Sequence, residues 1–243
     1  YNPKGQLYTP VDRDQVMYYR EDKAGQILQE GINEAGGMAS WIAAATSYST
    51  NNRIMVPFYV YYSMFGFQRI GDLAWAAGDM QARGFLLGGT SGRTTLNGEG
   101  LQHEDGHSHI LANTIPNCVT YDPTFAHEVA VIMHHGMKRM VEQQENVFYY
   151  ITLLNENYAM PGLTAGTEEQ IIKGMYMCKP GAVPPQGTSG ASEQRVQLLG
   201  SGTILRESIA AQTLLAADWG IQADVWSCPS FNELTREGQD AER

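Results

Sequence analysis

The chain has 243 residues, and its 16 Lys and Arg against 26 Asp and Glu give a formal net charge of −10. This acidic balance argues against a nucleic-acid-binding protein, which needs a dense Lys and Arg surface to neutralise phosphates. No stretch approaches the roughly 18 to 20 consecutive apolar residues of a membrane-spanning helix, and the first residues do not resemble a signal peptide. We therefore expect neither nucleic acid nor a membrane as partner, and a cytoplasmic location.

Helical and extended stretches alternate along the first two thirds of the chain. Residues 26–48 carry apolar side chains at helical spacing, as one helix or as two joined near Gly36 and Gly37. Hydrophobic periodicity then predicts strands at 54–60, 85–87, 117–121 and 147–154, with helices at 62–83 and 124–142. Strands separated by helices of this length predict crossover connections, and hence an α/β fold with a mostly parallel sheet covered on both faces.

A composition break follows in the last third of the chain. Residues 180–193 are rich in Pro, Gly and Ser and offer almost nothing to bury, which indicates an interdomain linker or a flexible loop. Beyond it, a strand at 196–202 that ends in a glycine turn, a helix at 205–219 and a strand at 223–227 form one strand-helix-strand unit. Since one such unit cannot cover its own sheet, we expect the beginning of a second α/β domain here.

The three cysteines, Cys118, Cys178 and Cys228, are odd in number, far apart and outside any C-x-x-C pair. In a chain without a visible export signal, this usage favours buried and reduced thiols over disulfides. A catalytic or metal-bound thiol is the alternative.

The string His103-Glu104-Asp105-Gly106-His107 satisfies the H-E-x-x-H pattern of zinc hydrolases. In those enzymes a helix places both histidines on one face, one turn apart, and the glutamate acts as a base for metal-bound water. Here glycines surround the string and no amphipathic run encloses it, which favours a loop whose imidazoles and carboxylates converge on a ligand. A zinc hydrolase using His103, Glu104 and His107 stays an alternative, as does a solvated polar loop.

Glu34 lies among small and apolar residues, where a carboxylate without a partner would be desolvated. Such burial raises a carboxyl pKa and suits the group to sharing a proton near neutral pH, unless Glu34 is an ordinary exposed helix residue. In the aromatic run 58–67, Tyr62 and Phe65 would share one face of a helix. They predict either a stacking wall for a flat heteroaromatic ligand or plain core.

Four stretches closely resemble the homodimeric bacterial type of pyruvate dehydrogenase E1 component, a thiamine-diphosphate enzyme of the transketolase-like superfamily. They are Gln29–Glu34, Ser47–Asn52, Tyr61–Asp72 and Thr90–His109. The resemblance runs through essentially the whole chain, and the last stretch is specific to this E1 type.

The resemblance implies a pyrimidine-binding domain over residues 1–163, in which residues 4–20 form a loop that orders over the active site. It implies an interdomain connection over 164–194 and the beginning of the transketolase C-terminal domain over 195–243. The family's diphosphate and magnesium motif, and the first strand of its pyrimidine-binding domain, have no counterpart here. We therefore expect a fragment of a longer subunit that is inactive alone.

By the same resemblance, Glu34 matches the glutamate that hydrogen-bonds the aminopyrimidine ring of the cofactor. The apolar wall around that ring is matched by Ile32, Tyr62 and Phe65. Active-site positions near the substrate end are matched by Glu99 and His103, whereas His107, with Asp105 and His109, lies in a loop that transketolase relatives use for substrate contacts.

The implied activity is decarboxylation of pyruvate and transfer of the acetyl group to the lipoyl arm of E2, the dihydrolipoamide acetyltransferase. The implied cofactors are thiamine diphosphate and Mg²⁺, with the magnesium ligands outside this chain. Active sites between two subunits of a homodimer would explain a charged fraction of 17%, below the roughly 25% of an average soluble protein. The alternatives are another thiamine transferase, such as a transketolase, and a non-catalytic interaction module.

Overall fold

A computed structural model describes residues 3–15, 18–92, 98, 100–182 and 195–243 of the chain. They divide into two compact units, Tyr1–Asn33 and Glu34–Arg243. The described part of the first unit, which includes most of the expected active-site loop 4–20, consists of turns and irregular chain without helix or strand. A hydrogen bond connects the beginning of this loop to the residue that follows its end, because the side-chain oxygen of Gln6 accepts from the Glu21 amide at 2.8 Å.

The main sheet of the second unit has four parallel strands in the order β1-β2-β4-β3. The strands are β1 (Phe58–Tyr62), β2 (Phe85–Gly89), β3 (Cys118–Tyr121) and β4 (Phe148–Thr152). Helix α3 (Ser63–Asp79) connects β1 to β2, and α5 (Ala126–Met137), extended by the π-helical turn η2 (Lys138–Glu142), connects β3 to β4. The predicted α/β fold with a parallel sheet is therefore confirmed.

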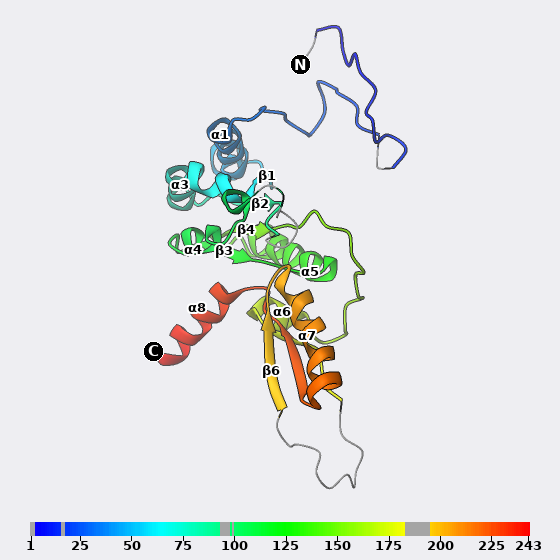
Figure 1. Ribbon diagram of the computed structural model, residues 1–243. Coiled ribbons are helices and arrows are strands. Elements are labelled where there is room, and N and C mark those ends of the chain that lie inside the picture. Colours follow the sequence, from blue (N-terminus) through cyan, green and yellow to red (C-terminus); the bar gives the residue numbers. More distant parts are fainter. Residues whose placement is uncertain (1–2, 16–17, 93–97, 99, 183–194) are drawn as a thin grey trace. The chain divides into compact units, whose positions relative to one another are not determined.

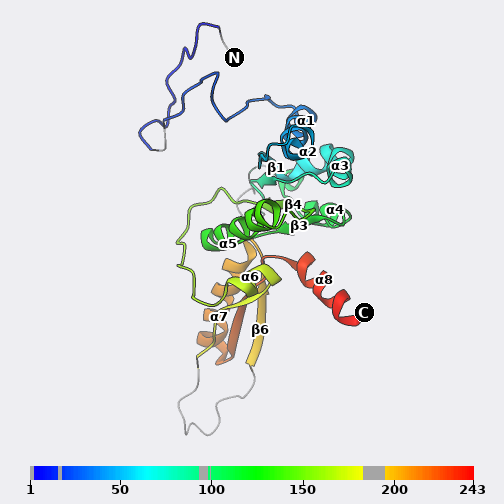
Figure 2. The same cartoon turned by 180° about the vertical axis from the view of Figure 1, so that it is seen from behind.

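Helices cover both faces of this sheet (Figures 1 and 2). Side chains alternate across β4, so that Phe148 and Tyr150 enter one core cluster and Tyr149 and Ile151 the other. The first cluster is completed by α1 (Glu34–Ala45), α3 and α4 (Ser108–Ala112), and the second by α5 and α6 (Glu168–Lys173). Burial on both faces explains why the central strands read as continuous apolar runs.

A smaller sheet follows, with strands in the order β5-β7-β6. Strands β6 (Arg195–Gly200) and β7 (Gln222–Ser227) are parallel and are joined by α7 (Ile204–Trp219), as predicted. Strand β5 (Tyr176–Lys179) pairs antiparallel with β7, although it lies inside the expected connection 164–194. The described part of that stretch therefore contributes a strand to this sheet, whereas residues 183–194 lie outside the described residues.

The helix expected from residue 26 begins only at Glu34 and ends at Ala45, followed by the short α2 (Ser47–Thr50). Gly37 lies inside α1 and does not break it. A Cβ at Gly37 would lie 2.6 Å from the ring of Tyr59, so glycine lets the helix approach β1 closely. The elements that we did not expect are η1 (Leu101–His103), α4, α6, β5 and α8 (Phe231–Glu242).

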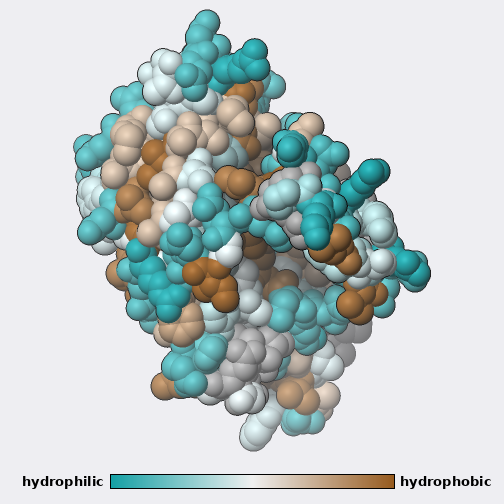
Figure 3. Space-filling view, turned by 90° about the horizontal axis from the view of Figure 1, so that it is seen from above, coloured by the Kyte–Doolittle hydropathy of each residue, from teal (hydrophilic) through white to brown (hydrophobic). Residues whose placement is uncertain are grey.

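The three cysteines form no disulfide, and Cys118 and Cys228 are buried, as predicted, whereas Cys178 is only half buried. Burial raises the pKa of the Cys228 thiol to about 11, so it is protonated at neutral pH. Within the described ranges, no helix combines the length and the apolar character needed to cross a membrane. Hydrophilic and hydrophobic residues are interspersed on the face drawn in Figure 3.

A buried carboxylate ties the two sheets together. Glu128, at 0% exposure on α5, accepts hydrogen bonds from the amides of Thr124 (2.6 Å) and Phe125 (2.9 Å). Its second oxygen accepts bonds from the hydroxyls of Tyr176 on β5 (2.8 Å) and Ser227 on β7 (2.5 Å). Four donors thus offset the desolvation of one carboxylate.

Replacing Glu128 by Ala should lower the free energy of unfolding by at least about 3 kcal/mol, because four donors lose a charged acceptor. Chemical denaturation of the variant measures this change. Glu142→Ala, an exposed position on η2, is the matched control and should stay within about 0.5 kcal/mol. Equal stability of the two variants would show that Glu128 does not link the sheets.

Candidate functional site

Glu34 begins α1, and its carboxylate forms an ion pair with the guanidinium of Arg69 on α3. A hydrogen bond from its own backbone amide and the bond from Arg69 together lower the pKa of Glu34, against the smaller opposing effect of burial. The expectation of a desolvated carboxyl with a raised pKa is therefore wrong for this structure. The reason is that hydrogen-bond donors reach the carboxylate, which keeps 19% of its side-chain surface exposed.

Tyr59 on β1 supports the same helix end. Its hydroxyl donates to the backbone carbonyl of Glu34 at 3.2 Å, and its ring occupies the space next to Gly37. The first turn of α1 is thereby held against the sheet.

Three rings gather beside this ion pair: Tyr62 at the end of β1, Phe65 in the first turn of α3, and His103 in η1. Their centroids lie 5.4 to 5.7 Å apart. The Tyr62 hydroxyl lies 2.9 Å from His103 Nδ1 and donates to the His103 carbonyl at 3.1 Å. The Arg69 guanidinium lies 5.0 Å from the centroid of the Phe65 ring and so joins the rings to Glu34.

Four residues predicted from separate stretches of the sequence thus come together, namely Glu34, Tyr62, Phe65 and His103. We call them, with Arg69, the aromatic cluster. Sequence reasoning did not single out Arg69, although its position one helical turn after Phe65 places both side chains on one face of α3.

Ile32 belongs to the first unit, where its side chain is 98% exposed, and Glu99 lies outside the described residues. The expected roles of these two residues stay predictions.

The H-E-x-x-H string is a loop, as expected, and its two histidines face different partners. The 3₁₀ turn η1 ends at His103, Glu104 is extended (φ −90°, ψ 99°), and α4 begins only at Ser108. His103 contacts Tyr62, whereas Nε2 of His107 lies 2.9 Å from the amide nitrogen of Gln68 on α3. Among the described residues, no three His, Cys, Asp or Glu side chains converge as metal ligands do. This geometry disfavours the zinc alternative.

Asp105 organises this loop. Its buried carboxylate accepts hydrogen bonds from the amides of His107 (3.2 Å) and Ser108 (3.1 Å) and from the Ser108 hydroxyl (2.5 Å). Ser108 in turn accepts a bond from the hydroxyl of Tyr150 on β4 at 2.9 Å. The loop is therefore fixed to the centre of the sheet through buried groups.

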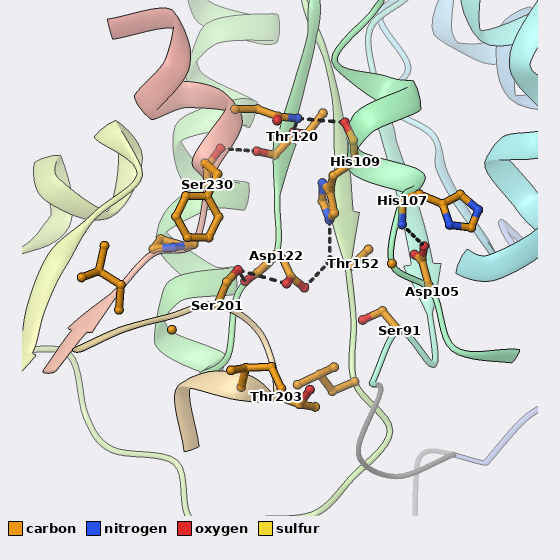
Figure 4. A pocket seen from close by; sticks show the side chains of 18 residues that line it. Ser91, Asp105, His107, His109, Thr120, Asp122, Thr152, Ser201, Thr203 and Ser230 are labelled. Atoms are coloured by element: carbon orange, nitrogen blue, oxygen red, sulfur yellow. Dashed lines mark hydrogen bonds between the residues drawn. The ribbon is translucent and has the colours of Figure 1, made fainter. Parts of the chain in front are cut away.

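A cavity of about 320 Å³ lies at the carboxyl ends of the strands β3, β4 and β6 (Figure 4). One side carries Asp105, His107 and His109, and the other carries residues that follow β6 and β7, including Ser201, Thr203 and Ser230. Ligands of open α/β sheets bind at this edge. The further polar lining residues that sequence reasoning missed are Ser91, Thr120, Asp122, Thr152 and Asn232. Ser91 lies inside the stretch Thr90–His109, whereas the other four belong to no motif, because they stand at the ends of β3 and β4 and in the first turn of α8.

Comparisons with known proteins agree over the whole chain. A sequence model of the pyruvate dehydrogenase E1 component middle domain matches residues 1–161, and one of the transketolase-like C-terminal domain matches residues 174–243. The chain is 66% identical over 243 residues to the pyruvate dehydrogenase E1 component of Pseudomonas aeruginosa, and 66% identical over 244 residues to that of Escherichia coli K12. Each match covers 100% of this chain and 27% of the relative, so the chain spans about a quarter of their length.

Solved structures support the fold. The transketolase from Leishmania mexicana superposes with a TM-score of 0.63 at 14% identity, over 85% of this chain and 27% of that one. The transketolase from Campylobacter jejuni gives a TM-score of 0.56 at 15% identity, over 80% of this chain and 27% of that one.

Replacing Arg69 by Gln should raise the pKa of Glu34 part of the way to its ordinary value, because the backbone donor remains while the guanidinium is lost. A ¹³C NMR titration of the Glu34 carboxyl measures the shift, with the exposed Arg53→Gln as control. Since the folded-state pKa of Glu34 is lowered, the stabilisation from this pair is present above the ordinary carboxyl pKa and is lost as the pH falls. An unchanged or lower pKa in the Arg69 variant would contradict the assigned cause.

Proposed function

Because the chain belongs to the pyruvate dehydrogenase E1 component middle-domain family, we propose that it forms the part of such an E1 that holds the pyrimidine end of thiamine diphosphate. The complete enzyme would decarboxylate pyruvate and transfer the acetyl group to the lipoyl arm of E2. The observation that carries this proposal is the convergence of Glu34, Tyr62, Phe65 and His103 from three separate segments.

The donor set of the aromatic cluster suits the ring end of the cofactor. Tyr62 and Phe65 are half buried and offer aromatic faces to a flat heterocycle, and Glu34 offers a carboxylate to a ring nitrogen. When bound, thiamine diphosphate supplies the nucleophilic carbon and the electron sink for decarboxylation. Mg²⁺ needs oxygen ligands, and the diphosphate needs hydrogen-bond donors or cations. We propose that both sets of groups lie outside this chain.

The charge state of Glu34 determines whether its carboxyl would accept or donate a hydrogen bond at the pyrimidine ring of the cofactor. A lowered pKa keeps the carboxyl ionised at neutral pH, so that it accepts a hydrogen bond and holds a proton on the ring nitrogen. Arg69 would share the same carboxylate and limit its movement. We propose that His103, held by Tyr62, moves protons on the substrate side.

Several further features of the complete enzyme follow as proposals. We propose a cytoplasmic bacterial homodimer with pyruvate as substrate and E2 as partner. We also propose a pyrimidine-binding domain over 1–163, with 4–20 as its active-site loop and Glu99, His107 and Ile32 near the cofactor. The expected division into a connection over 164–194 and a C-terminal domain over 195–243 is kept, except that β5 is counted with the C-terminal domain. Since the chain spans about a quarter of its relatives, we expect it to be inactive alone.

An exchange of segments tests the function. In the Escherichia coli enzyme, the matched segment is replaced by these 243 residues, and CO₂ release from pyruvate is measured. The hybrid should be active, and Glu34→Gln in it should lower kcat by about 10²- to 10⁴-fold, because a positioned proton acceptor is lost.

Glu142→Gln in the same hybrid is the matched control and should keep the activity. A Glu34→Gln hybrid with near-normal kcat would refute the assignment of Glu34. Ketol transfer between sugar phosphates without decarboxylation of pyruvate would favour a transketolase instead, and stoichiometric zinc that is lost on His103→Ala would favour the hydrolase.

A further inference from the structure

A chain of hydrogen bonds lies on the cavity wall and runs from His109 to the C-terminal region (Figure 4). Nε2 of His109 lies 2.9 Å from the hydroxyl of Thr152, the last residue of β4. The Thr152 hydroxyl donates to Asp122, directly after β3, at 2.6 Å. The hydroxyl of Ser201, directly after β6, donates to the other oxygen of Asp122 at 3.0 Å.

Counting protons along this chain determines the tautomer of His109. The Thr152 hydroxyl has one proton and two possible acceptors, the Asp122 carboxylate at 2.6 Å and the carbonyl of Tyr121 at 3.3 Å. The shorter of these bonds runs from the Thr152 hydroxyl to the Asp122 carboxylate and uses its single proton. Nε2 of His109 must therefore donate to the Thr152 oxygen. The neutral ring then carries its proton on Nε2, and Nδ1 is the nitrogen that takes up a second proton.

We propose that Thr152 and Asp122 are positioning residues that fix the Nε2–H tautomer of His109, so that His109 accepts and releases protons at Nδ1. The part of this inference that concerns the reaction rests on the proposed function. The tautomer rests only on the hydrogen bonds of this chain.

Burial and packing hold this arrangement in place. Thr152 is 1% exposed, and the imidazole of His109 packs on the ring of Tyr150 with centroids 5.1 Å apart. The side-chain amide of Asn232 on α8 donates to the backbone carbonyl of His109 at 3.0 Å and to the hydroxyl of Thr120 at 2.5 Å. Both the ring and the backbone of His109 are thus fixed from neighbouring elements.

The glycine turn after β6 supports the same hydrogen-bonded arrangement around Asp122. Gly202 has a positive φ of 51°, and its amide donates to the carbonyl of Asp122 at 3.1 Å. A Cβ at Gly202 would lie 2.6 Å from the Asp122 carboxylate. Glycine therefore allows the C-terminal region to approach Asp122 closely enough for Ser201 to bond it.

The neighbouring His107 has the opposite tautomer. The amide nitrogen of Gln68 has protons only to give, so Nε2 of His107 accepts, and the neutral ring carries its proton on Nδ1. Among the described residues, Asp105, His107 and Asp122 line the cavity together with His109, and Tyr150 packs on its ring. On α8, Glu233 is paired with Arg236.

NMR of the 243-residue chain tests the tautomer directly. Histidine ¹⁵N shifts distinguish Nε2–H from Nδ1–H, and we expect Nε2–H for His109. Thr152→Val, which keeps the side-chain shape but removes the hydroxyl, should shift the population toward Nδ1–H, and Thr152→Ser should restore Nε2–H. An Nδ1–H ring in the unaltered chain, or the same tautomer in Thr152→Val, would overturn the proposal. Thr114→Val, at an exposed position after α4, is the control.

The hybrid enzyme tests the role in the reaction. Thr152→Val should lower kcat about tenfold or more and change KM less. One limb of its pH profile of activity should be displaced. Thr152→Ser should recover most of the activity. A normal kcat and pH profile in Thr152→Val would overturn this role even where NMR establishes the tautomer. If Glu34→Gln loses activity while Thr152→Val stays normal, this inference fails and the proposed function stands. If Glu34→Gln keeps near-normal activity, the proposed function itself fails.

Discussion

The parallel register of β3 and β4 is the constraint on which the polar architecture depends. Cys118 lies opposite Phe148 and Tyr121 opposite Ile151, so both strands end at the same edge. The residues that follow, Asp122 and Thr152, are thereby brought within hydrogen-bond distance although thirty positions separate them in the chain. A shift by one residue would turn every side chain of β4 to the other face and remove the hydrogen bond between Thr152 and Asp122.

The buried hydroxyls of Tyr150 and Thr152 need hydrogen-bond partners, and the segment that covers this edge of the sheet provides them. Tyr150 and Thr152 stand in a strand that is buried throughout, and a buried hydroxyl without a partner costs about 1–3 kcal/mol. Ser108 and His109 at the start of α4 supply those partners. The sheet therefore stabilises the loop conformation, and the loop in turn satisfies the polar groups of the sheet.

Periodicity predicted the long elements that bury extended faces, such as α3, α7 and the apolar central strands. It missed α8, whose twelve residues include no buried one. It could not predict η1, α4 or β5, which have three to five residues and depend on contacts with distant elements. The same limit applies to the site. Motif resemblance identified Glu34, Tyr62, Phe65 and His103. The lowered pKa of Glu34, however, depends first on a backbone hydrogen bond at the start of α1 and then on Arg69, thirty-five positions away. Asp122, Thr152 and Ser201 carry no local signal, since only the strand order brings them together.

The loop from His103 to His109 connects the two polar regions of the second unit. His103 belongs to the aromatic cluster with Tyr62, and His109 lies on the cavity wall next to residues from β6 and α8. Between them, the Asp105 carboxylate fixes two backbone amides of the same loop. These bonds fix the part of the loop that leads into α4 and His109. Residues after β6 and on α8 thus support His109, through the bond from Ser201 to Asp122 and the bond from Asn232 to the His109 carbonyl.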